Sequence, residues 1–299
     1  MRISILTLFT ALCCTVTLVQ AQMAKSNVYV FDLLVKNDSI GLSNPRFLTH
    51  FNENSYNNHP YFINNDELYI SAKLPYEDQP DVYQFNLATK ERLRVTATRE
   101  GEYSPRRMPD YYSFSAVRME FHEQDTFQRL WQFPVDRSNN GQPVFRDIAN
   151  IGYYEWLNSR DLLLFLVDQP NQLVRADVYA NTTEVIATRP GRCFVNLGNG
   201  QVLYVDKGTK PYRIMQYNSR AFGNREELEE VVPTRPNSED FAVLYNGTIL
   251  MGQDSELYSF RPGIDESWQL VADLRAYNIS GITRLAISPN SSRIAVVAN

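Results

Sequence analysis

The sequence predicts an all-β protein: a single six-bladed β-propeller whose ring is closed by strands from both ends of the chain. Three observations predict it. The composition favours strands, with 18 Tyr and 16 Phe and many short β-branched or aromatic runs bounded by Asn, Asp, Gly and Pro. A strand–turn–strand unit recurs six times, at about 45 residues per step, the period of four-stranded propeller blades. No stretch sustains a long apolar pattern with the 3.6-residue period of a helix.

Each of the six units is centred on a tight turn between two apolar runs. The turns fall at residues 64–66, 109–110, 158–161, 199–200, 246–247 and 289–292. Two of them contain Asn-Gly, the strongest short hairpin signal, because both central residues of a type I′ turn need a positive φ angle. Six matched units argue against the alternative, an all-β sandwich with similar strand spacing.

A second pair of strands follows every hairpin except the last. These pairs begin near residues 81, 129, 172, 212 and 256. The missing pair is found near the N-terminus, where residues 27–32 and 45–49 resemble residues 81–86 and the strand that follows them. We expect this N-terminal pair to complete the last blade, which closes the ring and removes the exposed edges of an open array. Residues 226–232 are the segment where we expect a short helical insertion.

The N-terminus has the pattern of an export signal. Arg2 supplies a positive charge, residues 3–19 form an apolar stretch, and Val-Gln-Ala at residues 19–21 offers a small-residue cleavage site. We expect residues 1–21 to be a cleaved signal peptide and residues 22–299 to form the propeller domain, in the periplasm or outside the cell. The alternative is an uncleaved anchor, but Ser and Thr residues dilute the stretch, which is short for a membrane span.

The mature chain is mildly acidic and has a single cysteine. The net charge of −5 becomes −6 when Arg2 leaves with the signal, and no basic run argues for binding to nucleic-acid phosphates. Leu12, rather than a small residue, precedes Cys13, so we expect free export and no lipid anchor. Cys193 then remains alone and no intrachain disulfide is possible. Outside the signal, no stretch is long and apolar enough to span a membrane.

The last hairpin carries a family resemblance. Residues 281–290, Gly-Ile-Thr-Arg-Leu-Ala-Ile-Ser-Pro-Asn, closely resemble the Ser-Pro-Asp-Gly hairpin of TolB-like propellers, with Asn290 for the usual Asp and Ser291 for the usual Gly. Further segments resemble the same bacterial family, at residues 55–60, 102–105, 108–110 and 238–241. The resemblance covers essentially the whole mature chain and implies a periplasmic six-bladed propeller. TolB has an extra N-terminal domain and a partner-binding tail that we do not expect in this chain, so no role in the Tol–Pal system is implied.

The sequence lacks the familiar signatures of catalysis. It contains no Gly-x-Ser-x-Gly elbow, His-Glu-x-x-His pair, phosphate-binding Gly-rich loop or Cys-x-x-Cys motif. The three histidines, His50, His59 and His122, fall in different loops, so we predict no metal site and no cofactor. We expect Cys193 to be buried as a small apolar residue. No residue is therefore assigned as catalytic.

We place a candidate ligand site at the mouth of the axial channel, where the loops that enter the inner strands meet. The candidate residues lie in or beside these loops: Tyr56, Asn57, Asn58, His59, Glu102, Tyr103, Ser104, Tyr153, Arg192, Glu239 and Asp240. Arg192 would face the three carboxylates of this set, forming a mixed-charge ring of the kind that binds a polar ligand or a peptide terminus. Residues 73–81, with Glu77, Asp78 and Asp81, would add an acidic lip. The alternative is that these residues are ion pairs and caps between blades.

Two classes of function remain open at this point. The first is a non-catalytic scaffold that binds an envelope or extracellular protein or peptide, as a monomer. The second is a hydrolase or lyase with an acid/base pair among the channel carboxylates, which requires them to converge within about 10 Å. A Ca²⁺ site in the channel is a weaker third option that no spacing selects.

Overall fold

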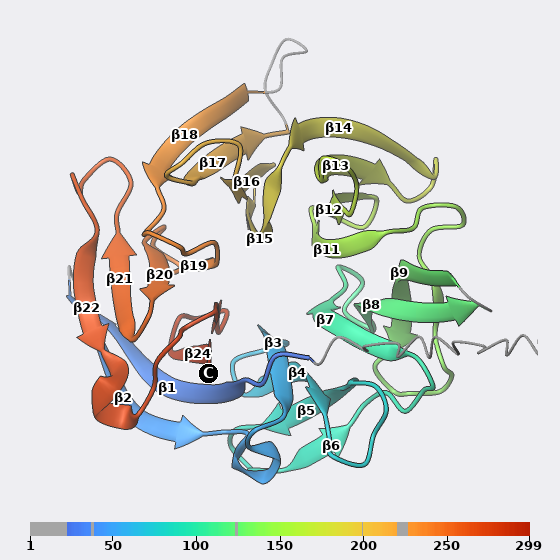
Figure 1. Cartoon of the computed structure of the whole chain (residues 1–299), viewed down its shortest axis with the longest axis horizontal. Coiled ribbons are helices and arrows are strands. Elements are labelled where there is room, and N and C mark those ends of the chain that lie inside the picture. The colour runs from blue at the N-terminus through green and yellow to red at the C-terminus, as the bar shows by residue number, and fades with distance from the viewer. Residues whose placement is uncertain (1–22, 37–38, 123–124, 199, 220–226) are drawn as a thin grey trace, which may run out of the picture.

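The molecule is a ring of six four-stranded antiparallel sheets, arranged as blades around a centre (Figure 1). The computed structural model describes residues 23–36, 39–122, 125–198, 200–219 and 227–299. Within these ranges the helical structure consists of two 3₁₀ helices, His50–Asn52 and Leu274–Tyr277. The predicted all-β, six-bladed propeller is therefore confirmed. The expected signal peptide, residues 1–21, lies outside the described residues.

The blades follow one another along the chain, and the bounds of their strands are these. Blade 1 contains β3 (Tyr56–Phe62), β4 (Glu67–Lys73), β5 (Asp81–Asn86) and β6 (Arg92–Arg94). Blade 2 contains β7 (Gly101–Arg107), β8 (Ser113–His122), β9 (Asp125–Pro134) and β10 (Gln142–Pro143). Blade 3 contains β11 (Ile151–Trp156), β12 (Asp161–Leu166), β13 (Gln172–Asp177) and β14 (Thr182–Thr188).

The second half of the chain forms the other three blades. Blade 4 contains β15 (Pro190–Gly198), β16 (Gln201–Asp206), β17 (Arg213–Asn218) and β18 (Glu227–Pro233). Blade 5 contains β19 (Phe241–Val243), β20 (Ile249–Gln253), β21 (Glu256–Phe260) and β22 (Gln269–Asp273). Blade 6 contains β23 (Arg284–Ile287) and β24 (Arg293–Ala298), together with β1 (Asn27–Lys36) and β2 (Ser39–Phe47).

The turns that gave the repeat its signature are stabilised by short polar side chains. In blade 1, Asn64 Oδ1 accepts hydrogen bonds from the amides of Asp66 and Glu67, both at 2.9 Å. In blade 3, Asn158 Oδ1 accepts from the amides that follow it in the same way. In blade 5, Gly247 has a φ of 83°, which glycine adopts without steric cost. Asn and Gly therefore mark the hairpins because they satisfy or permit the turn backbone.

Pairing between β1 and β24 closes the ring as predicted. The two strands run antiparallel in continuous register, from Asn27 opposite Ala298 to Asp32 opposite Arg293. Alternate residues of this pair face opposite sides of the sheet. Val30 and Val297 pack with the blade 1 core, whereas the other face packs with blade 5. Val30 and Val297 are fully buried, and burial of a valine contributes about 1.5–3 kcal/mol, so apolar packing stabilises the seam.

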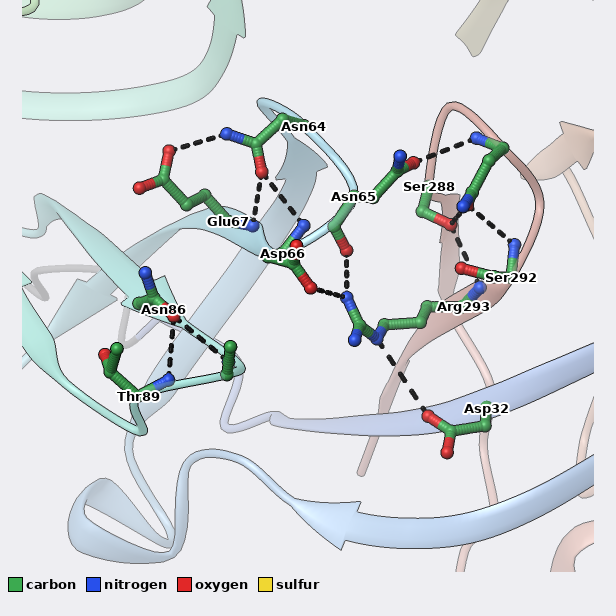
Figure 2. Close-up of polar contacts among 12 residues, drawn as sticks. Asp32, Asn64, Asn65, Asp66, Glu67, Asn86, Thr89, Ser288, Ser292 and Arg293 are labelled. Carbon is green, nitrogen blue, oxygen red and sulfur yellow. Dashed lines mark hydrogen bonds and ion pairs between the residues drawn. The ribbon is translucent and has the colours of Figure 1, made fainter.

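Polar contacts also tie the seam to blade 1, as Figure 2 shows. Arg293 of β24 donates from Nη1 to the carbonyl oxygen of Asn65 and lies 2.6 Å from Asp66 Oδ1. Its Nε lies 4.0 Å from Asp32 Oδ1 of β1. The amide of Asn290 donates to Asn65 Oδ1 at 3.0 Å. One side chain therefore joins the C-terminal strand, the N-terminal strand and the first blade.

The expectation of a short helix at residues 226–232 was wrong. Its described part belongs to the strand β18, which pairs with β17 through contacts such as Ile214 opposite Val232. The free edge of β17 offers a full ladder of hydrogen-bond partners, so tertiary pairing overrides the helix propensity of the glutamates. No helix among the described residues combines the length and hydropathy needed to cross a membrane.

Replacing Arg293 with alanine should lower the free energy of unfolding by about 1–2 kcal/mol, since it removes charged hydrogen bonds whose partners are partly exposed. Arg275, in the 3₁₀ helix that follows blade 5, forms a surface ion pair with Asp273 and is the matched control. R275A should cost less than about 0.5 kcal/mol. Urea denaturation of both variants measures the difference, and equal losses would show that the Arg293 contacts do not reinforce the seam.

Candidate functional site

Inner strands from all six blades surround a cavity of about 320 Å³ on the axis of the ring. Five of these strands, β3, β7, β11, β15 and β19, face the centre in Figure 1, and the sixth is β23, the edge strand of its sheet. Each blade contributes at least one polar side chain from within its inner strand or directly before it: His59, Ser104, Tyr153, Arg192, Asp240 and Arg284. Ring closure therefore brings together polar groups that are far apart in sequence.

Two of these residues occupy unusual backbone conformations. His59 and Ser104 have φ angles of 55° and 53°, a left-handed region that residues other than glycine seldom occupy, and each precedes a proline. The strand register shifts at both positions, which marks β-bulges. The Ser104 amide donates a hydrogen bond to His59 Nδ1 at 3.1 Å. Bulges redirect side chains, and such local strain is concentrated at functional sites.

Three tyrosine rings surround the imidazole of His59. The ring centroids of Tyr56, Tyr103 and Tyr153 lie 6.2, 6.1 and 6.1 Å from that of His59, each edge-on. Burial lowers the pKa of His59 well below 6.5, and the positive charges of nearby arginines lower it further. The ring is therefore neutral at pH 7. Because Nδ1 accepts the Ser104 amide, the proton is on Nε2.

Two arginines at this level of the cavity share one carboxylate. Arg284 donates from Nη2 to the Tyr153 hydroxyl at 3.1 Å, and its Nη1 lies 3.6 Å from Asp240 Oδ2. Arg192 donates from Nη2 to the carbonyl oxygen of Thr283 at 2.7 Å, and its Nε lies 4.0 Å from the same Asp240 oxygen. Neither distance to Asp240 is that of a hydrogen bond.

The carboxylate of Asp240 is held in place by the neighbouring blade. Its Oδ1 accepts a hydrogen bond from the Leu285 amide at 2.8 Å. Burial raises the pKa of Asp240, and the charges of Arg284 and Arg192 oppose that rise. Glu239, one residue earlier, accepts from Lys207 Nζ at 2.7 Å. Glu239 lines a smaller recess of about 100 Å³ that shares Asp240 and both arginines with the axial cavity.

A second charge pair lines the same cavity. Arg106 Nη1 lies 2.6 Å from Glu155 Oε2, and the guanidinium carbon of Arg106 lies 5.4 Å from the ring centroid of Tyr61. Burial raises the pKa of Glu155, whereas the charge of Arg106 lowers it. These two charges therefore neutralise one another within the cavity wall.

The structure brings most of the predicted site residues together. His59, Ser104, Tyr153, Arg192 and Asp240 line the axial cavity, and Glu239 lines the adjoining recess. Tyr56 and Tyr103 pack against His59, and Asn58 Oδ1 accepts from the His59 amide at 2.8 Å. Asn57 is fully buried and donates to the carbonyl oxygens of Ser26 and Asn52, so it anchors the chain beneath the site.

Glu102 does not belong to this ring of charges. Its side chain is buried, accepts a hydrogen bond from Thr98 Oγ1 at 2.6 Å and forms an ion pair with Arg118 Nε at 2.9 Å. The guanidinium carbon of Arg118 in turn lies 3.8 Å from the ring centroid of Trp131. Alternation along β7 explains the placement, because Glu102 and Tyr103 point to opposite faces of the strand.

The expected acidic lip does not form either. Asp81 is buried and bonds to Arg94 and to Thr96 Oγ1. Glu77 accepts hydrogen bonds from the Leu74 amide and from the Tyr83 hydroxyl. Both carboxylates therefore stabilise the loop and the blade, as the alternative of structural caps predicts. Asp78 has no part in the cavity lining.

Three charged residues that line the cavity were missed in the sequence: Arg106, Glu155 and Arg284. Arg284 begins β23, the position in its blade that corresponds to the predicted residues of the others. Its place in the repeat was therefore a usable signal. Arg106 and Glu155 lie further along their strands, beyond the loops where the channel mouth was expected.

The remaining reactive side chains show no catalytic arrangement within the described part of the chain. Cys193 is buried, its Sγ lies 3.1 Å from the carbonyl oxygen of Phe241, and burial raises the pKa of its thiol. Among the described residues, no group of three or more His, Cys, Asp or Glu side chains is arranged to hold a metal ion.

Comparisons with known proteins show similarity of fold and no closer relationship. No family model matches the sequence, and no curated protein matches it. TolB from Acinetobacter baumannii is similar in structure, with a TM-score of 0.54 and 10% identity over 92% of this chain and 64% of that chain. A TolB-like protein from Agrobacterium tumefaciens has a TM-score of 0.63 and 9% identity over 92% of this chain and 98% of its own.

An enzyme is also among the similar structures. Oligogalacturonate lyase from Vibrio parahaemolyticus has a TM-score of 0.51 and 15% identity, over 92% of this chain and 98% of that chain. At these identities the likenesses show the fold alone. They confirm the TolB-like six-bladed propeller that the sequence resembled, and this chain spans less than two thirds of the A. baumannii protein.

The buried Glu102 should make stability depend on pH. Burial raises its pKa from 4.5 to about 7, although Thr98 and Arg118 oppose the rise. The folded state therefore holds this proton more tightly than the unfolded state, and the stability it contributes is lost as pH rises through the folded pKa. We expect loss of this proton to lower the melting temperature as pH rises from 4.5 to about 7, and we expect a smaller fall in E102Q. Thermal denaturation across that range measures both proteins, and an identical pH profile would contradict the assignment.

Proposed function

We propose that the protein is an exported, non-catalytic propeller that binds a protein or peptide of the periplasm or the cell exterior at the mouth of its axial cavity. The TolB-like fold supports a binding scaffold. Export rests on the expected signal peptide at residues 1–21. The proposal places the contact at the start of the inner strands, where Arg192, Glu239 and Asp240 lie.

The observation that carries the proposal is the mixed-charge cluster at the cavity mouth. Arg192 lies 3.6 Å from Glu239 and 4.0 Å from Asp240, and Asp240 lies 3.6 Å from Arg284. Backbone groups position the members of this cluster, since Thr283 accepts from Arg192 and Leu285 donates to Asp240. Donors and acceptors held in a rigid frame lose little entropy on binding, which favours recognition of a polar partner.

The same contacts argue for binding over catalysis. A general acid/base pair among Glu102, Glu239 and Asp240 would need two of these carboxylates to face a substrate without being held by other side chains. Glu102 instead forms an ion pair with Arg118, and Glu239 accepts a hydrogen bond from Lys207. The Nδ1 atom of His59 accepts a backbone amide, so this nitrogen is not available as a base.

A hydrolase or lyase is the second candidate, because Asp240 shares the axial cavity with a carboxylate outside that set, Glu155. Burial raises the pKa of both Asp240 and Glu155, which line the same space, and a structurally similar protein is an oligogalacturonate lyase. Incubation with oligogalacturonate tests it. Product formation that is lost in D240N would support the enzyme over the scaffold.

Removing charges at the mouth should abolish partner capture. We expect the purified wild type to retain a specific protein or peptide from the envelope fraction, and the double variant R192A/E239A to retain less than about a tenth of it, since hot-spot contacts dominate interface energy. R275A/D273A is the matched control, because it also removes one positive and one negative side chain and leaves the net charge unchanged. Equal capture by all three proteins would reject this mouth as the binding surface.

The proposed export gives an independent prediction. Cleavage at the small-residue site should produce a mature protein that begins at Gln22, and the protein should fractionate with the periplasm or the medium. Intact-mass measurement of the fractionated protein reads the first residue directly. A mass that includes residues 1–21, or recovery in the cytoplasm, would contradict export.

A further inference from the structure

Arg192 and Arg284 have hydrogen-bond donors that the described residues do not satisfy. A guanidinium offers five N–H donors, yet each of these two arginines donates one hydrogen bond to a described residue. The Nε atoms of both are buried and have no hydrogen-bond acceptor within that part of the chain. Buried donors are nearly always paired in native proteins, so their pairing here calls for a further acceptor.

The other charges around the cavity are already matched. Arg106 is paired with Glu155 at 2.6 Å, and Lys207 is paired with Glu239 at 2.7 Å. Both pairs have the short distances of charge-assisted contacts. They leave no excess charge of either sign in their parts of the wall.

The remaining arginines therefore outnumber their carboxylate. Arg192 and Arg284 carry two positive charges, and Asp240 supplies one negative charge at 4.0 and 3.6 Å. Glu239 also lies 3.6 Å from Arg192, but it is shared with Lys207 at 2.7 Å, so three positive charges face two negative charges. The side chain of Arg284 is only 11% exposed. An uncompensated charge this deeply buried is costly unless an anion joins it. The cluster is one negative charge short.

We propose that a ligand bearing a single carboxylate completes this cluster, with its carboxylate between Arg192 and Arg284 and its body in the axial cavity. This inference rests on the proposed function and names the ligand chemistry of the same site. A carboxylate accepts two N–H donors side by side from a guanidinium, which matches the unused donors of both arginines. Both arginines also line the smaller recess, so the group sits where the two spaces meet.

The charge count favours a carboxylate over a phosphate. A phosphate monoester carries about −1.5 to −2 at pH 7, which exceeds the single unmatched positive charge and would repel Asp240. The cavity of about 320 Å³ takes a small group beyond the carboxylate, and its lining includes the aromatic residues Tyr153, Tyr154 and Phe194. The carboxylate can belong to a polypeptide C-terminus or to a free sugar acid, and the experiment separates these sources.

Calorimetric titration of the intact protein with acid and neutral pairs tests the proposal. Hippurate, a glycine carboxylate on an aromatic amide, represents a polypeptide C-terminus, and hippuramide is its neutral counterpart. D-galacturonate and D-galactose form the sugar pair. We expect at least one acid to bind about tenfold or more tightly than its neutral partner. The pair that shows the preference identifies the source of the carboxylate.

Substitutions at the two arginines should remove that preference. R192Q and R284Q should each weaken binding of the acid by about tenfold and leave the neutral compound unchanged. R160Q, at an exposed arginine paired with Asp177, is the matched control and should bind like the wild type. The acid–neutral comparison needs only the wild type, so it remains decisive if R284Q does not fold.

Absence of any acid preference in the wild type, or a preference that survives in R192Q, would overturn the carboxylate site. That failure is distinguishable from failure of the proposed function. A partner captured through the cavity mouth by an internal or amidated segment would keep the scaffold and reject the carboxylate.

Discussion

The antiparallel pairing of β1 with β24 is the contact on which the rest of the structure depends. It joins residues 27–32 to residues 293–298 and turns two half-sheets into a complete blade. Without it, blades 1 and 5 would each lose a neighbour, and buried valines on both faces of the seam would meet water. The axial cavity needs this closure as well, because Arg284 comes from the C-terminal half of the blade and His59 from the next blade around the ring.

The sequence allowed the ring to be predicted more completely than the site, for a physical reason. Blade number depends on turns, and turns depend on local chemistry, such as the side-chain cap of Asn64 or the positive φ of Gly247. The complementary half-blade could be recognised because a β-strand pattern is short and periodic. The strand at residues 227–233 was missed because its pairing with β17 is a tertiary effect.

The site could be predicted only in part, because its geometry depends on which residues of each strand point toward the axis and which point into the blade. The strand β7 turns Glu102 into the blade and Tyr103 toward His59. The bulges at His59 and Ser104 then shift the register. No residue pattern in the sequence predicts whether the side chains after each bulge point toward the axis or into the blade. A position in a loop near the channel therefore predicted correctly that Arg192 and Asp240 line the cavity. The same reasoning failed for Glu102.

The polar contacts of the seam and those of the axial cavity differ in how completely their charged groups are paired. At the seam, Arg293 is paired with Asn65, Asp66 and Asp32, and within blade 1 Asp81 is paired with Arg94 and Thr96. Such contacts stabilise the seam and the first blade. At the axis, Arg192 and Arg284 retain buried donors and share one carboxylate. A purely structural network would gain stability by pairing these groups, so their incomplete pairing is better explained by a bound anion than by the needs of the ring.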